Sequence, residues 1–113
     1  SLPNHNERLE FIGDGILQGV VTSLLSQRYP TYSEGRLTKE RARLVSNWAL
    51  AKVAKRYHLD QQMLLAKGAV KQGCRKNYKI LGGVVEAFIG AYFIDSGYSY
   101  ANAERFVRRL LDL

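Results

Sequence analysis

The stretch NERLEFIGDGILQGVVTSLLSQ, residues 6–27, decides the fold class of this chain. Its apolar side chains recur every three or four residues, which is the spacing of one face of an α-helix. The residues with this spacing are Leu9, Ile12, Ile16, Leu17, Val20, Val21, Leu24 and Leu25. The stretch therefore predicts a long amphipathic helix from Asn6 to Gln27. Because no segment of the chain alternates convincingly between apolar and polar residues, we expect an all-α protein.

A second helix is expected after Pro30 and the polar residues that follow it, which end the first pattern. Thr38 can open this helix, and apolar residues at helical spacing continue it to His58. Beyond it, residues 60–65 predict a short helix. Residues 67–79 are rich in Gly, Lys and Arg and predict a basic loop.

Residues 80–94 form the most apolar segment, and Glu86 is the one charged residue in it. A segment of this length is too short to cross a bilayer, so it predicts a buried central helix and no membrane partner. Gly97 is expected to end that helix, and Ser99 can cap a last helix whose apolar face turns inward.

Length and charge narrow the class of protein further. A chain of 113 residues is the size of one domain with a single modest core, so we expect one domain over residues 1–113. Seventeen Lys and Arg against ten Asp and Glu give a net charge of +7, which favours a polyanionic partner, nucleic acid above all. The single cysteine, Cys74, excludes an internal disulfide and fits an intracellular location, with the cytoplasm favoured and an organelle left open.

Three acids stand where apolar neighbours make a carboxylate costly. Glu10 and Asp14 are four residues apart and share one face of the first predicted helix. Glu86 lies in the middle of the apolar helix, where an unpaired carboxylate takes up a proton or destabilises the fold. An Arg or Lys partner would compensate any one of them. Three such acids in a basic protein favour Mg²⁺, which binds a few carboxylates, keeps several waters and bridges to phosphate.

These residues resemble a known family. Residues 6–14, NERLEFIGD, resemble the nine-residue signature of ribonuclease III, and four more segments follow that family's pattern in order and spacing: Tyr29–Pro30, residues 34–38, residues 41–46 and residues 86–91. The resemblance covers the whole chain and implies the helical endonuclease-domain fold, assembled as a two-fold dimer. The helix that normally precedes the signature, and the double-stranded-RNA-binding domain that often follows, are not in this sequence.

The resemblance also implies roles for individual acids. Glu10 and Glu86 correspond to metal ligands, and Asp14 and Glu86 correspond to residues essential to hydrolysis. The family has a further Asp one turn before Glu86, and here that position is Gly83, which has no ligand atom. Glu34 matches an additional acid near the cleavage centre, although a Glu in a polar turn is more often simply solvated.

The partners expected from the resemblance are double-stranded RNA and a second subunit. Phe11 resembles the side chain that enters the partner subunit, with ordinary core packing as the alternative. A homodimer is expected, and a heterodimer with an intact partner stays open. Double-stranded RNA is recognised through its shape, phosphates and 2′-hydroxyls. Basic residues that could contact phosphates are Arg36, Lys39, Arg41, Arg43, Lys67, Lys71, Arg75, Lys76 and Lys79.

Two functions follow from these observations. The first is a Mg²⁺-dependent endoribonuclease, with Mn²⁺ as a substitute cation, that cleaves double-stranded RNA to 5′-phosphate and 3′-hydroxyl ends and is impaired by Gly83. The alternative is a catalytically inactive relative that binds RNA or dimerises within a ribonucleoprotein complex. Gly83 favours the alternative. The presence of Glu10, Asp14 and Glu86 favours the enzyme, because none of them is needed for packing.

Overall fold

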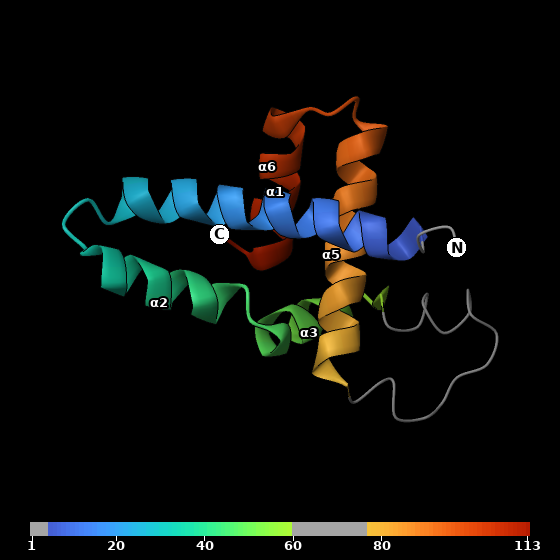
Figure 1. Ribbon diagram of the computed structural model, residues 1–113, viewed down its shortest axis with the longest axis horizontal. Helices are drawn as coiled ribbons and strands as arrows, with labels where there is room; N and C mark the ends of the chain where they lie inside the picture. Colours follow the sequence, from blue (N-terminus) through green and yellow to red (C-terminus); the bar gives the residue numbers. More distant parts are fainter. Residues whose placement is uncertain (1–4, 60–76) are drawn as a thin grey trace.

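The computed structural model describes residues 5–59 and 77–113, and these residues form helices and no strand (Figure 1). The helices are α1 (His5–Arg28), α2 (Glu34–Leu44), α3 (Asn47–Arg56), α5 (Tyr78–Asp95) and α6 (Tyr100–Leu111). The all-α prediction is therefore confirmed. The short helix expected at residues 60–65, Cys74 and most of the basic loop lie outside the described residues.

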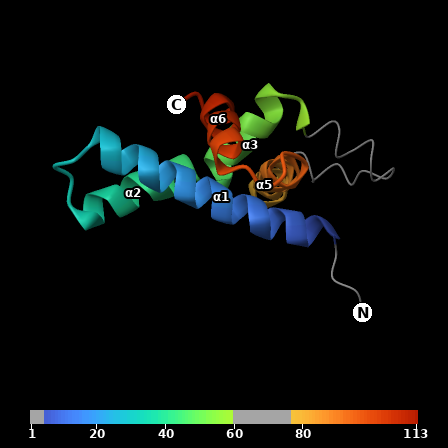
Figure 2. The same ribbon diagram turned by 90° about the horizontal axis from the view of Figure 1, so that it is seen from above.

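Helix α5 is the centre of the bundle. Helix α1 crosses it, and α3 packs against it at its N-terminal half, while α2 runs back alongside α1 (Figures 1 and 2). The largest fully buried side chains come from α1, α3, α5 and α6 and are Leu17, Val21, Leu50, Leu81, Val85, Ile89 and Val107. None of the described helices is long and apolar enough to cross a membrane.

The prediction of a single helix from Thr38 to His58 was wrong, because the chain forms two helices there. Ser46 has an extended backbone, and its hydroxyl accepts a hydrogen bond of 3.1 Å from the Ala49 N–H, which starts α3. Helix α2 likewise begins earlier than expected, because Ser33 rather than Thr38 caps it, accepting from a backbone N–H at 3.2 Å. The break lets α3 turn its apolar face toward α5, whereas α2 buries no residue.

The predicted end of α5 and start of α6 are confirmed. Gly97 has a φ of +76° and follows the C-cap, a conformation that glycine adopts without strain. The Tyr98 N–H then donates to the Phe93 carbonyl at 3.0 Å, and the two rings meet edge to face. Ser99 caps α6 as expected. Helix α5 begins two residues earlier than predicted, because the side chain of Asn77 accepts from the first free backbone N–H groups.

Candidate active site

Two glycines let α1 and α5 cross with their backbones in contact. A Cβ on Gly13 would overlap the carbonyl oxygen of Glu86, and a Cβ on Gly90 would overlap the carbonyl oxygen of Leu9. No larger residue could occupy either position without moving a helix. The crossing therefore brings the α1 residues around Gly13 next to the middle of α5, where Glu86 lies.

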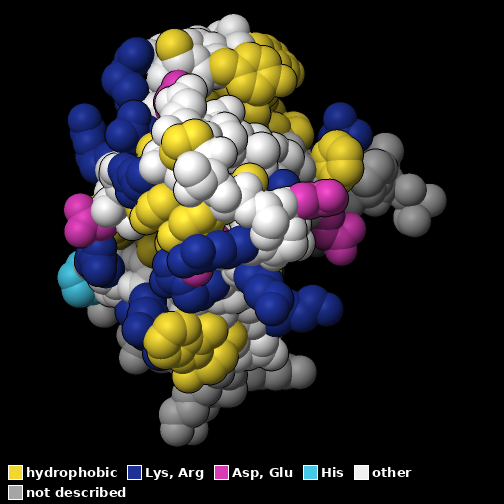
Figure 3. All heavy atoms as spheres, turned by 90° about the vertical axis from the view of Figure 1, so that its left-hand side faces the viewer, with side chains coloured by type: hydrophobic (Ala, Val, Ile, Leu, Met, Phe, Trp, Pro, Cys, Tyr) yellow, Lys and Arg dark blue, Asp and Glu magenta, His cyan; other side chains and the backbone are white. Residues whose placement is uncertain are grey.

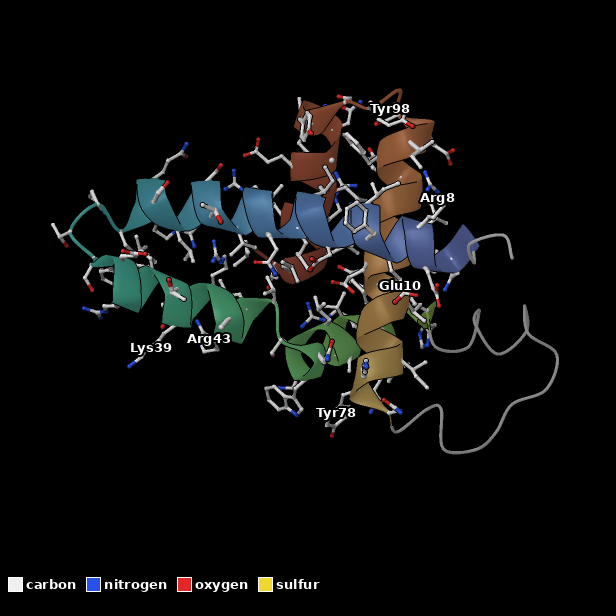
Figure 4. The ribbon with its side chains drawn as sticks, viewed as in Figure 1. Arg8, Glu10, Lys39, Arg43, Tyr78 and Tyr98 are labelled. Atoms are coloured by element: carbon white, nitrogen blue, oxygen red, sulfur yellow. The ribbon has the colours of Figure 1, made fainter. Side chains whose placement is uncertain are left out.

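Helix α1 supplies two of the predicted acids to this crossing. Glu10 is half-buried and lies where α1 passes over α5 (Figure 4). The side-chain amide of Asn6 donates a hydrogen bond of 3.3 Å to Oε2 of Glu10. Asn6 was not predicted as a site residue, although its position four residues before Glu10 is the spacing that places two side chains together on a helix. Asp14 is exposed, so the prediction of apolar surroundings for it was wrong. This position of α1 faces solvent.

Helix α5 supplies Glu86, which the crossing places beside both α1 acids. Burial raises the pKa of Glu86 to about 8, helped by a hydrogen bond with Asp14 and by the negative charges of Asp14 and Glu10. Within residues 5–59 and 77–113 the structure contains one ion pair, between Arg43 and Glu40. No Arg or Lys of these residues therefore compensates Glu86, and without a cation it is largely protonated at neutral pH.

Gly83 lies directly against Glu10. A Cβ at position 83 would overlap Oε1 of Glu10 and lie 3.0 Å from its Cδ. The obstacle is the end of a flexible side chain, which can turn aside, and not backbone. An aspartate at this position would thus place a second carboxylate beside that of Glu10.

The acids present suit Mg²⁺ by type and charge. Their oxygens are the donors that Mg²⁺ prefers, and a cation would relieve the repulsion that raises the pKa of Glu86. Among the residues that the structure describes, however, no group of three or more His, Cys, Asp or Glu side chains is arranged to hold a metal ion. Glu10 and Glu86 are consequently suitable ligands but do not form a finished coordination shell.

Within one chain, Glu34 does not lie near Glu10, Asp14 and Glu86. It is the first residue of α2, at the end of the molecule far from Glu10, and it lines a shallow pocket together with Thr22 (Figure 1). Thr22 is twelve residues beyond Glu10 on the same helix, which corresponds to about 18 Å. A role for Glu34 at the site stays a prediction.

Phe11 is the most exposed large apolar side chain among those described, with 81% of its surface accessible. Core packing against the described residues, the alternative explanation for Phe11, is therefore excluded. The side chain lines a shallow surface pocket with Glu7, Arg8 and Ile12, next to the acidic site on α1.

Known proteins resemble this chain over nearly its whole length. The family model described as Ribonuclease-III-like matches residues 1–112. The chain belongs to this family. A protein named Ribonuclease 3 from Oleidesulfovibrio alaskensis is 46% identical over 97 residues, which are 86% of this chain and 42% of that protein. The chain spans about two-fifths of the length of the curated ribonuclease III relatives it matches.

Solved ribonuclease III structures share the fold. The nuclease domain of ribonuclease III from Campylobacter jejuni, described as flexible in a region involved in dimer formation, superposes with a TM-score of 0.76 at 30% identity, covering 99% of this chain and 77% of that one. Dicer from Pichia stipitis gives a TM-score of 0.79 at 30% identity, covering 96% of this chain and 48% of that one. The ribonuclease III fold expected from the sequence is confirmed.

Proposed function

We propose that this chain is the catalytic domain of a Mg²⁺-dependent endoribonuclease that cleaves double-stranded RNA to 5′-phosphate and 3′-hydroxyl ends. The observation that carries this proposal is the meeting of Glu86 with Asp14 and Glu10 at the α1–α5 crossing, without a compensating Arg or Lys among the described residues. Relatives named Ribonuclease 3 support the reaction class.

The acids have different environments, and this suggests different roles. Glu10 and Glu86 would hold the cation, which when bound polarises a phosphate oxygen and lowers the pKa of a bound water. Glu86 must give up its proton for this, and Asp14 is the hydrogen-bonded neighbour beside it. Asn6 holds one oxygen of Glu10 and thereby orients that carboxylate. Asp14 is exposed and so is accessible to substrate.

Double-stranded RNA is the proposed substrate because of charge. The chain carries a net charge of +7, and Arg36, Lys39 and Arg43 of α2 are all exposed. Figure 3 shows Lys and Arg side chains gathered over the end of the molecule formed by α2 and the end of α1. Such a surface attracts phosphates without reading a base sequence.

Cleavage of a long labelled double-stranded RNA tests the proposal. We expect cutting that requires Mg²⁺ or Mn²⁺, with ends carrying 5′-phosphate and 3′-hydroxyl groups. Glu86→Gln should lower the rate by about 10²–10³-fold, since it removes the charged ligand and keeps its shape. Asp95→Asn, which changes an exposed acid at the end of the same helix, is the matched control and should cut like the parent chain. Equal activity of the parent and Glu86→Gln would refute the proposed site.

We also propose that the chain forms a homodimer through Phe11. A ring that is 81% exposed beside the acidic site gains by burial in a second subunit, and a solved relative is described as having a region involved in dimer formation. Phe11→Ala should weaken dimerisation by about 30-fold in sedimentation velocity, as expected for a buried aromatic anchor. Tyr78→Ala removes an exposed ring at the start of α5 and should have no effect. A parent chain that stays monomeric would contradict the homodimer and favour a heterodimer.

The second candidate is a catalytically inactive protein of the same fold that binds RNA or dimerises in a ribonucleoprotein complex. Gly83 favours it, because the site lacks a donor there and no metal-holding group is formed among the described residues. Absence of cleavage by the parent at every metal concentration, with RNA binding retained, would establish this candidate.

A further inference from the structure

A shallow groove separate from the acidic site runs between α3, the end of α2 and the end of α6. It has a volume of about 280 Å³. Its lining includes the basic residues Arg43, Lys52 and Arg56, the apolar residues Leu110 and Leu111 of α6, and Trp48. Arg43 also belongs to the basic surface proposed to attract double-stranded RNA, but none of these residues belongs to the acidic site.

The exposure of Trp48 is the observation that indicates a ligand. The sequence pattern placed it among the apolar residues of a helix, yet 54% of its surface is exposed. The buried face of α3 is formed instead by Leu50, Ala51, Val53 and Ala54. Trp48, Lys52 and Arg56 follow one another at intervals of four residues and form one exposed stripe along α3. The indole of Trp48 is therefore not part of the hydrophobic core.

A cation lies over the exposed indole. The ammonium of Lys52 sits 3.6 Å from the centre of the Trp48 ring, and Arg56 lies one turn further along the same stripe. A second such pair joins α3 to α5, where Lys55 lies 5.7 Å from the ring centre of Tyr78. Figure 4 shows Arg43 and Tyr78 on the same side of the molecule. Aromatic rings interleaved with Lys and Arg are the composition of surfaces that bind unpaired nucleotides.

We infer that this groove binds an unpaired nucleotide of an RNA strand, with the base stacked on Trp48 and the phosphate held by Lys52 and Arg56. A base that replaces the ammonium on the ring leaves Lys52 free to meet the phosphate next to that base, so the ring and the ammonium each gain a new partner. Bases within a duplex are already stacked and cannot do this. An acidic peptide would use the charges alone and leave the indole uncovered. The inference does not rest on the proposed cleavage, because it requires neither a metal nor the acids.

Binding can be followed directly, because Trp48 is the only tryptophan of the chain. The intact chain is titrated in EDTA with a single-stranded oligoadenylate of six nucleotides, and the indole fluorescence is recorded. We expect saturable quenching that weakens with salt. By anisotropy of the labelled oligonucleotide, Trp48→Ala should bind about tenfold more weakly, whereas Trp48→Phe, which keeps a ring for stacking, should bind nearly as well as the parent.

A matched pair of charge variants separates this groove from general attraction to phosphates. Lys52→Ala and Arg105→Ala each remove one exposed positive charge, but Arg105 is on α6 and does not line the groove. Only Lys52→Ala should weaken binding by more than about threefold. The inference would be overturned by equal binding of Trp48→Ala and the parent, by equal losses in the two charge variants, or by indole quenching with polyglutamate and not with the oligonucleotide. A blunt RNA duplex should not quench Trp48, and quenching by it as strong as by the single strand would overturn the inference as well.

Discussion

Gly13→Ala is expected to lower the melting temperature by about 10 °C, the largest stability effect that we predict for a single methyl group in this chain. The added Cβ would overlap the carbonyl oxygen of Glu86, which belongs to the backbone of α5 and cannot turn aside. Separating the two helices would open the core on both sides of the crossing, at a cost of about 3 kcal/mol. Thermal unfolding followed by circular dichroism measures the effect.

Gly19→Ala is the matched control for this prediction. It adds the same methyl group to the same helix, but nothing lies within 4 Å of the new Cβ. Alanine is also favoured over glycine inside a helix by about 1 kcal/mol. We expect this variant to melt at the same temperature as the parent or slightly higher. A Gly13→Ala protein as stable as Gly19→Ala would show that α1 and α5 do not meet through Gly13.

Gly83→Asp is expected to raise the rate of RNA cleavage at limiting Mg²⁺ by about 10- to 100-fold. The new carboxylate would stand beside that of Glu10, which can move because only its side-chain end is in the way. The substitution should not harm the helix, because Asp is a slightly better helix former than Gly. Initial rates across a Mg²⁺ titration would show a lower metal requirement, a higher maximal rate, or both.

Gly83→Asn serves as the control, since it has the shape of Asp without the charge. It should leave the metal requirement close to that of the parent. If Asp and Asn had equal effects, the gain would come from packing against Glu10 and not from a new ligand. If Gly83→Asp cut no faster than the parent, position 83 would not limit this site.

Local signals were enough to predict most of the helices. The period of residues 6–27 predicted α1, and the caps at Gly97 and Ser99 placed the end of α5 and the start of α6. The break between α2 and α3 was missed because it depends on one hydroxyl of Ser46, and the apolar period runs through it. Trp48 fits the same period, but the turn at Ser46 leaves it outside the core.

The candidate site was predictable in part. The spacing of Glu10 and Asp14 indicated that they share a helix face, since that depends on one helix alone. Their approach to Glu86 depends on a contact between distant segments, which residue spacing does not encode and which only the resemblance implied. The glycines of the crossing are unusual already in the sequence, because Gly13 and Gly90 lie inside helices, where glycine is unfavourable.

Binding of Mn²⁺ tests directly whether Glu10 and Glu86 form a cation site at the α1–α5 crossing. The free Mn²⁺ signal in electron paramagnetic resonance gives the affinity of the parent chain. The pKa of Glu86 is raised to about 8, so below that pH the cation must displace a proton from this carboxyl group. We therefore expect the affinity for Mn²⁺ to rise as the pH rises toward 8. Glu10→Gln and Glu86→Gln should each bind at least about tenfold more weakly, and Asp95→Asn should bind like the parent. Absence of Mn²⁺ binding by the parent chain, or binding that both site variants retain in full, would contradict this account.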